Sequence, residues 1–215
     1  MKLWSDSFKD GDNIPGKFAF CVSDPATHVA MSSNRNPHFA WSEVPAGTKS
    51  LALICHDRDV PSRGDDVNQE GRTVPADLPR VDFFHWTLID LPPTMNSIAA
   101  GQYCDGITGR GKPGPAIEGG RPGRHGINDY TGWFAADADM AGDYYGYDGP
   151  CPPWNDSLLH HYVFTLFALD IEKLPVEGKF TGQQVRDAMR GHVLARAELT
   201  GTYTLNPQLM KPGSK

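Results

Sequence analysis

The chain lacks the features that mark membrane proteins and nucleic-acid-binding proteins. It has no run of 18 apolar residues, and its N-terminus turns polar at once. We therefore expect no integral membrane association, no secretory signal and a cytoplasmic location. Lysine and arginine number 20 against 26 acidic residues, for a net charge of −6. Because nucleic-acid binders usually carry a basic face, we expect no nucleic-acid partner.

Cysteine is also scarce. The four cysteines are Cys21, Cys55, Cys104 and Cys151, and none of them forms a C-x-x-C pair. Their spacing matches no zinc motif, so we predict no metal and no cofactor. In a reducing compartment we expect all four to be free thiols, with Cys21 and Cys55 buried as small hydrophobic side chains.

Glycine and proline are abundant instead, at 23 and 18 residues. This content indicates many turns and few long helices. A hydrophobic fraction of 39% and a charged fraction of 21% are typical of a globular protein. We predict a single domain over residues 1–206, followed by a flexible tail over 207–215.

Strand patterns dominate the chain, with one helix near the C-terminus. No alternation of strands and helices indicates a parallel sheet, so a sandwich of antiparallel sheets is expected. Long polar or glycine-rich loops are predicted over 65–80 and 101–126. The predicted strands cover 17–22, 50–56, 83–91, 161–169 and 197–205, and the predicted helix runs from Thr181 to about Leu194.

Polar clusters adjoin three of the apolar strands. Such groups must be paired or must face a cavity, and strand ends can bring them into one pocket. Taken singly, each cluster is equally well explained as a turn or as a buried histidine with a satisfied hydrogen bond. The clusters are His56-Asp57-Arg58-Asp59-Val60-Pro61, His85-Trp86 and His160-His161-Tyr162.

These clusters, in this order, resemble the phosphatidylethanolamine-binding protein family in its bacterial branch, the Raf-kinase-inhibitor-like proteins. The Asp57–Pro61 segment resembles the family's Asp-Pro-Asp-x-Pro motif, and His85-Trp86 resembles its His-Trp pair. The Gly149–Pro153 loop followed by His160–Tyr162 resembles Gly-Pro-x-Pro-Pro and His-Arg-Tyr. Asn36–Trp41 resembles a Ser-Pro-x-x-x-Trp stretch.

The resemblance implies a mostly β fold, in which a large central antiparallel sheet packs on a smaller sheet with few short helices. It also implies a small pocket for an anion, with backbone N–H groups near Gly149 and Cys151 as donors. The implied ligand-binding residues are Asp57, Pro61, His85, Gly149, Cys151, His160 and Tyr162. The implied supporting residues are Asp59, Trp86 and His161.

Two departures from the family pattern lie in these motifs. Arg58 stands where the family has proline, and His161 stands where it has arginine. In the family pattern that arginine pairs with the second aspartate of the motif. We therefore predict a pH-sensitive contact between Asp59 and His161. The segment 62–82 looks like an insertion and is expected to shape the mouth of the pocket.

The function expected from these residues is binding, not catalysis, because no motif holds a nucleophile beside a base. The expected ligand is a small anion such as phosphate, phosphorylethanolamine or a carboxylate. The resemblance implies modulation of a partner protein such as a kinase, and a homodimer. One alternative is a hydrolase with His85 or His160 as general base oriented by Asp57. A second is a zinc site formed by His56, Asp57, His85 and His160.

Overall fold

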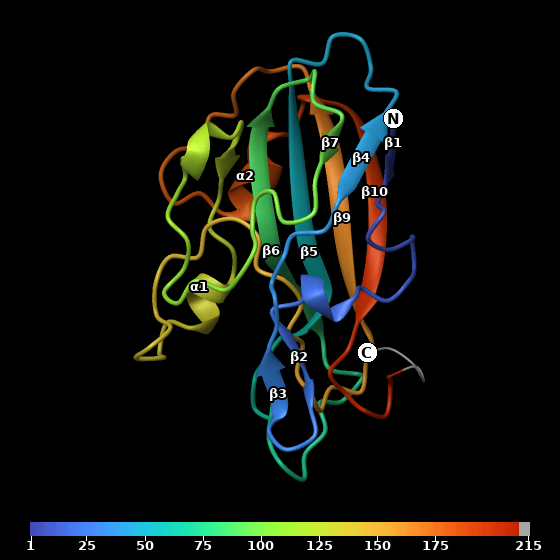
Figure 1. The fold of residues 1–215 in the computed structure, drawn as a ribbon, viewed down its shortest axis with the longest axis vertical. Coiled ribbons are helices and arrows are strands. Elements are labelled where there is room, and N and C mark those ends of the chain that lie inside the picture. Colours follow the sequence, from blue (N-terminus) through green and yellow to red (C-terminus); the bar gives the residue numbers. More distant parts are fainter. Residues whose placement is uncertain (211–215) are drawn as a thin grey trace.

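Strands form most of the ordered structure in the computed structural model, which describes residues 1–210 (Figure 1). The two α-helices and the 3-10 turns are short. The elements in chain order are β1 (Lys2–Trp4), η1 (Gly16–Phe18), β2 (Cys21–Asp24), β3 (His28–Met31), β4 (Phe39–Ser42), β5 (Ser50–Pro61), β6 (Arg80–Leu91), β7 (Ser97–Ile98), η2 (Glu118–Gly120), β8 (Arg124–His125), α1 (Tyr130–Trp133), β9 (His160–Leu169), α2 (Gly182–Ala188) and β10 (Val193–Tyr203).

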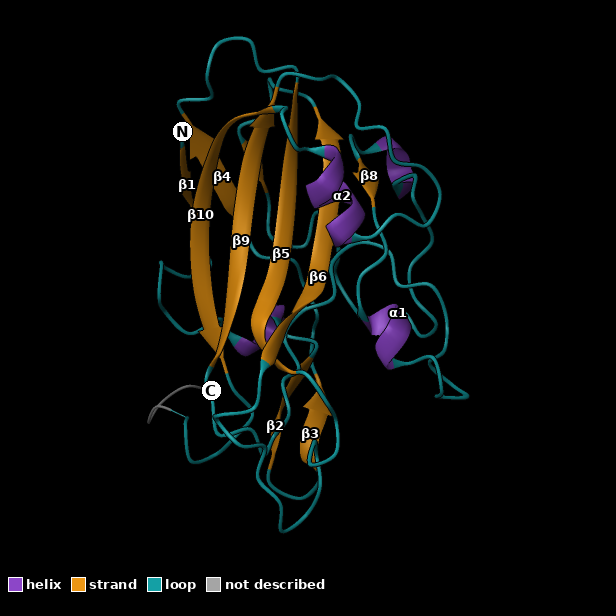
Figure 2. Cartoon of the chain, turned by 180° about the vertical axis from the view of Figure 1, so that it is seen from behind, coloured by secondary structure: helices purple, strands orange, loops and turns teal. Residues whose placement is uncertain are grey.

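The strands form three antiparallel sheets. The central sheet has the order β10-β9-β5-β6-β8, a smaller sheet has the order β1-β4-β7, and β2 and β3 form a hairpin. The smaller sheet covers one face of the central sheet, and α2 covers the other face (Figure 2). This arrangement confirms the predicted large sheet on a smaller sheet with few helices.

Strand β5 is apolar from Leu51 to Cys55 because both of its faces are buried there. Leu51, Leu53 and Cys55 pack into the core between the two sheets. Ala52 and Ile54 point the other way, into the core under α2. Because side chains alternate along a strand, a continuous apolar run is what such a position requires. Burying each leucine contributes roughly 1.5–3 kcal/mol.

Helix α2 begins where it was predicted but is shorter. Thr181 accepts a hydrogen bond from the backbone N–H of Gln184, whose side chain accepts from the Thr181 N–H in return, which is a capping box. The helix ends at Ala188, and Gly191 follows with a left-handed φ of 82°. Such a glycine turns the chain away from the helix axis, so the predicted end at Leu194 is wrong. The strand predicted over 197–205 begins earlier, at Val193.

The strand predicted over 17–22 is wrong for residues 17–20. Gly16–Phe18 form a 3-10 turn, and β2 begins only at Cys21. The segment 18–20 is buried on all sides, so its side chains do not alternate between core and solvent. Its backbone instead anchors the 149–153 loop, because the N–H groups of Phe20 and Cys21 both donate to the Pro150 carbonyl.

A disulfide joins Cys21 to Cys151, with their Cα atoms 4.9 Å apart. The expectation of free thiols is therefore wrong for these two residues. It holds for Cys55 and Cys104, which are buried and free, and Cys21 is buried as predicted. The two bonded cysteines are 130 residues apart, so only the fold brings them together.

The C-terminal segment is described as far as residue 210. Pro207–Leu209 form a turn in which the Leu209 N–H donates to the Asn206 carbonyl. The rest of the predicted tail, residues 211–215, lies outside the described residues. No helix in the described part of the chain has both the length and the apolar character needed to cross a bilayer.

Candidate functional site

Two irregularities in the pairing of β5 with β6 determine which way the polar motifs face. Cys55 pairs with Trp86 and His56 with Phe84, so His85 is the extra residue of a bulge. A second irregularity follows between Asp57 and Val60, within the Asp57–Pro61 motif. A bulge bends a strand and re-aims its side chains, which explains how both motifs face one cavity beside the sheet.

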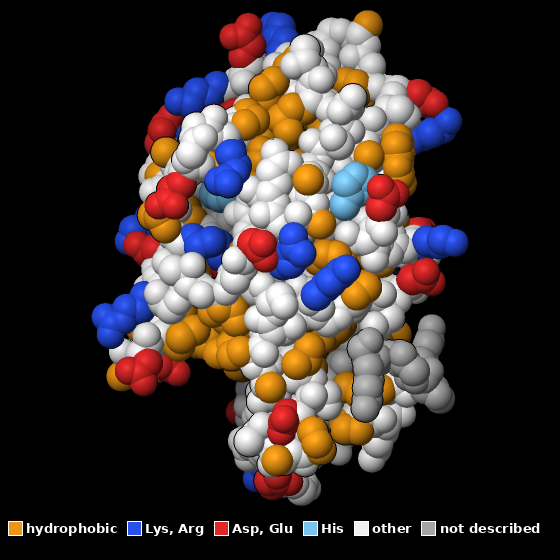
Figure 3. Space-filling view, in the orientation of Figure 1, with side chains coloured by type: hydrophobic (Ala, Val, Ile, Leu, Met, Phe, Trp, Pro, Cys, Tyr) orange, Lys and Arg blue, Asp and Glu red, His pale blue; other side chains and the backbone are white. Residues whose placement is uncertain are grey.

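The cavity has a volume of about 410 Å³ and lies between the lower end of the central sheet, the β2–β3 hairpin and α1. In Figure 3 hydrophobic side chains gather in a recess between α1 and this hairpin. Asp57, His85, His160 and Tyr162 supply the polar floor. The apolar part of the wall includes Phe20, Met31, Val60, Val67, Phe83, Tyr130, Trp133 and Phe134.

A chain of alternating charges crosses one side of the floor. His160 Nδ1 lies 2.6 Å from Asp57 Oδ2, and its Nε2 lies 3.1 Å from Asp156 Oδ2. Arg80 then binds Asp156 with both terminal nitrogens, at 2.6 and 3.1 Å. Bidentate pairing of this kind gives strong, well-oriented hydrogen bonds. Asp57, Asp156 and His160 are fully buried, and only Arg80 approaches solvent.

This arrangement holds a proton on His160. Burial alone would lower the pKa of His160, but the Asp57 charge and the hydrogen bonds to Asp156 and Asp57 raise it to about 9. The same contacts with His160 and Arg80 hold the pKa of Asp156 below its usual value despite its burial. Both ring nitrogens of His160 are bonded to carboxylates, so His160 is not available as a general base.

His85 has a different environment. Its Nδ1 donates to the Asp148 carbonyl at 2.8 Å, and burial lowers the pKa of the ring. The Asp148 side chain is itself fixed by Asn34, Lys112 and Asn128, each at 2.8 Å. His85 is therefore a neutral imidazole whose Nε2 remains available to a ligand, and Asp148, not Asp57, belongs to the group that orients it.

Tyr162 completes the floor. Tyr162 is 1% exposed, and its hydroxyl makes no well-aligned hydrogen bond among the described residues. Burial and the neighbouring Asp57 carboxylate raise the pKa of this hydroxyl. The Tyr162 ring packs edge-on against His85, with ring centroids 5.1 Å apart. A buried hydroxyl without a partner is costly, so it indicates a position where a ligand or water completes the bond.

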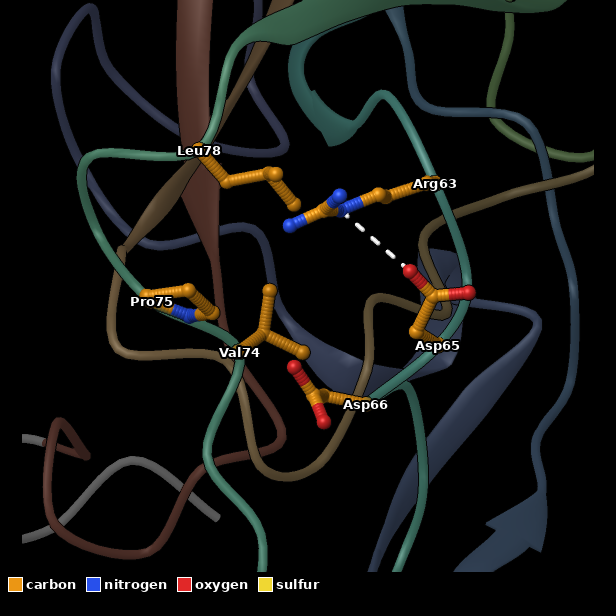
Figure 4. A pocket seen from close by; sticks show the side chains of 6 residues that line it. All are labelled: Arg63, Asp65, Asp66, Val74, Pro75 and Leu78. Atoms are coloured by element: carbon orange, nitrogen blue, oxygen red, sulfur yellow. Dashed lines mark ion pairs between the residues drawn. The ribbon is translucent and has the colours of Figure 1, made fainter.

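The loop after β5 forms part of the rim, as the sequence predicted. Ser62, Arg63, Gly64, Val67 and Asn68 line the cavity. Figure 4 shows the Arg63 and Asp65 side chains turned toward each other across this loop, 3.3 Å apart.

The predicted contact between Asp59 and His161 is present at the edge of the site. Both the backbone N–H and Nδ1 of His161 lie within 2.9 Å of Asp59 Oδ2. His161 thereby takes the place of the arginine of the family pattern. Arg80, at the start of β6, supplies a guanidinium from a different sequence position.

Gly149 is the one predicted ligand-binding residue that does not line the cavity. Its N–H donates to Asn34 Oδ1 at 2.8 Å, so it is not free to bind an anion. Glycine is needed here for space, because a Cβ would lie 2.2 Å from the Phe18 carbonyl oxygen. Trp86 lies in the core and donates to His125 Nε2 at 3.3 Å. Cys151 lines the wall through its disulfide.

The four residues of the zinc alternative do not converge. His56 faces the other side of the sheet, where its ring packs near Phe84 and its Nε2 lies 3.9 Å from Asp82. Within residues 1–210 no group of three or more histidine, cysteine and acidic side chains is placed to hold a metal ion.

Sequence reasoning missed Arg80, Asp156, Asp148 and the aromatic wall from α1. Asp156 precedes His160 by four residues, but in an irregular loop this spacing carries no periodic signal. Arg80 was placed at the end of a loop, yet it opens β6.

Comparison with known proteins identifies the family. The family model described as "Phosphatidylethanolamine-binding protein" matches residues 4–204. The chain belongs to the phosphatidylethanolamine-binding protein family.

Individual relatives match over nearly their whole length. The UPF0098 protein of Chlamydia muridarum is 32% identical over 94% of this chain and 98% of its own. The Escherichia coli UPF0098 protein YbhB is 28% identical over 95% of this chain and all of its own. The crystal structure of Escherichia coli YbcL, described as a new member of the mammalian family, superposes with a TM-score of 0.66 at 27% identity. That match covers 94% of this chain and 97% of YbcL.

Proposed function

We propose that this protein binds a small amphiphilic molecule in the Asp57–His85–Tyr162 cavity and performs no chemistry on it. The head of the ligand is a phosphate-type or carboxylate group on the polar floor, and its apolar part lies along the aromatic wall. The observation that carries this proposal is a cavity of about 410 Å³ that joins the polar floor of Asp57, His85, His160 and Tyr162 to an aromatic wall.

The binding role is favoured over the hydrolase alternative by the state of the histidines. His160 is held between two carboxylates, and a protonated ring cannot accept a proton. His85 retains a free ring nitrogen, but it is oriented by the Asp148 carbonyl and not by Asp57. Among the described residues, no serine, threonine or free cysteine is hydrogen-bonded to His85 as a nucleophile would be.

Calorimetric titration with phosphorylethanolamine at pH 6 tests the proposal. We expect saturable one-site binding, weakened at least tenfold in Tyr162→Phe, because a hydrogen bond to a charged group contributes about 1.5–3 kcal/mol. Lys179→Gln is the matched control, since Lys179 is exposed and pairs with Asp143 away from the cavity. No saturable binding by the native chain, or equal affinity of the Tyr162→Phe variant, would contradict the proposal.

Modulation of a partner such as a kinase and a homodimer are expected from the family resemblance alone, and a cytoplasmic location is expected from the polar N-terminus. The disulfide is a reason to examine the last of these, because such bonds persist mainly in oxidising compartments. Cell fractionation followed by thiol labelling would show where the protein resides and whether Cys21 and Cys151 are bonded there.

A further inference from the structure

The floor of the cavity is richer in hydrogen-bond acceptors than in donors. His85 Nδ1 faces a carbonyl oxygen, which can only accept, so Nδ1 carries the proton and Nε2 offers a lone pair. Asp57 is bonded through Oδ2 to His160 and through Oδ1 to the Asp59 N–H. Each carboxylate oxygen keeps a further lone pair, and neither can donate. The Tyr162 hydroxyl is the one donor of this floor without a well-aligned partner, and it lies beside the Asp57 carboxylate.

The charges around this floor leave no cation free for a ligand. From β9, the His160 cation is shared by Asp57 and Asp156, and from β6 the Arg80 guanidinium binds Asp156. These two cations and two carboxylates balance. Among the described residues that line the cavity, Arg63 is the one lysine or arginine, and it is exposed and paired with Asp65.

The remaining walls add no charge. From α1, Tyr130 donates its hydroxyl to the Gly149 carbonyl. The β2 side presents Phe20 and the Cys21–Cys151 disulfide. Behind His85, the Asp148 carboxylate is bound by Lys112 and two asparagines and does not line the cavity. Asp59 and His161 neutralise each other at the edge.

We propose that the site selects a head group that retains one acidic proton, such as a phosphomonoester in its monoanionic form. This inference rests on the proposed function and specifies its ligand. The P–OH group donates to Asp57 or to His85 Nε2, while a P–O oxygen accepts from Tyr162. A fully deprotonated dianion has no proton to offer and places two charges against the Asp57 carboxylate, without a free cation to compensate.

Butyl phosphate and butyl sulfate form a matched pair of probes. At pH 5.5 both are monoanions of similar shape, but only the phosphate carries a proton. We expect calorimetry to show butyl phosphate binding at least tenfold more tightly than butyl sulfate at that pH. Since the second pKa of a phosphomonoester is about 6, its affinity should fall about tenfold per pH unit between pH 7 and pH 8. Butyl sulfate should show no such fall.

The sulfate arm also controls for titration of the protein. If protonation of His85 at low pH created the binding site, both probes would bind more tightly there. Equal affinity of the two probes at pH 5.5, or butyl phosphate affinity that does not fall toward pH 8, would overturn this inference and leave the proposed function standing. No binding of either probe at any pH would overturn both.

A variant reverses the expected preference. Asp57→Asn replaces an acceptor with an amide that can also donate, so butyl sulfate should gain affinity and the pH dependence for butyl phosphate should weaken. Because this substitution also removes a partner of His160, circular dichroism must first show that the variant is folded. If it does not fold, the comparison of the two probes on the native chain remains decisive.

Discussion

The two histidines of the cavity floor are both buried, yet the protein gives them opposite chemistry. His160 lies between two carboxylates and holds its proton, with a pKa raised to about 9. His85 faces a single backbone carbonyl, and burial lowers its pKa. The difference shows that the partner atoms, not the depth of burial, decide whether a buried histidine carries charge.

The largest effect should come from breaking the carboxylate clamp on His160. Asp156→Asn removes the charge that His160 and Arg80 share, leaving two buried or half-buried cations with one carboxylate. We expect the free energy of unfolding to fall by about 3–5 kcal/mol, measured by urea denaturation. Asp143→Asn, in an exposed pair with Lys179, is the control and should change it by less than about 1 kcal/mol. A similar small loss in both variants would show that the charge chain contributes little.

His160 and His85 should also make the free energy of unfolding depend on pH, in opposite directions. The raised pKa of His160 gives a contribution that is complete below about pH 6.5 and is lost as pH rises through about 9. A difference of this size corresponds to about 3 kcal/mol. His85, with a lowered pKa, is the opposite case, because its unfolded form takes up a proton first and stability falls as pH drops below about 6.5.

Urea denaturation between pH 5 and pH 10 measures both slopes. In His160→Gln the loss on the alkaline side should flatten, while the loss on the acid side should persist. The acid side also contains His125, whose pKa burial lowers to about 3. An unchanged alkaline slope in His160→Gln would mean that another group titrates there.

A smaller loss of stability is expected when the neutral histidine, His85, is replaced. His85→Gln removes one hydrogen bond to the Asp148 carbonyl and leaves no charge unpaired. We expect it to lower the free energy of unfolding by about 1–2 kcal/mol, since a neutral hydrogen bond contributes about 1 kcal/mol and the side-chain shape also changes. A loss as large as that of Asp156→Asn would contradict the view that charge separates the two environments.

The smallest effect should lie at the half-exposed pair of Asp59 and His161. Asp59 also accepts from the His161 backbone N–H, and Asp59→Asn keeps an oxygen for that bond. We therefore expect a change of less than about 1 kcal/mol between pH 6 and pH 8 in the same denaturation assay. A larger loss would place this pair with the buried charge chain.

The sequence predicted the central strands because their apolar runs are long and both of their faces are buried. It also predicted most of the floor residues through their motifs. It could not predict where the strand pairing is interrupted, although the bulge at His85 directs that ring into the cavity. Nor could it predict partners such as Arg80 and Asp156, which lie 76 residues apart and meet only in the fold.

Gly149 shows a second limit of sequence reasoning, which concerns the role of a residue and not its position. The motif placed this residue correctly beside the site, but motif matching cannot tell a ligand donor from a residue chosen for its size. The neighbouring Phe18 carbonyl leaves no room for a Cβ, and Asn34 already takes the Gly149 N–H.

The Cys21–Cys151 disulfide encloses only some of the residues that form the cavity floor. It closes a covalent ring from Cys21 to Cys151 that contains Asp57 and His85, whereas His160 and Tyr162 lie outside it. Asp57 and His85 thus lie in a segment whose ends are covalently linked at the cavity wall, whereas His160 and Tyr162 are held by strand pairing. Opening the ring would free a 130-residue loop in the unfolded chain and favour that state. The oxidised and the reduced chain are therefore covalently different molecules, one looped and one linear, although both have the same sequence.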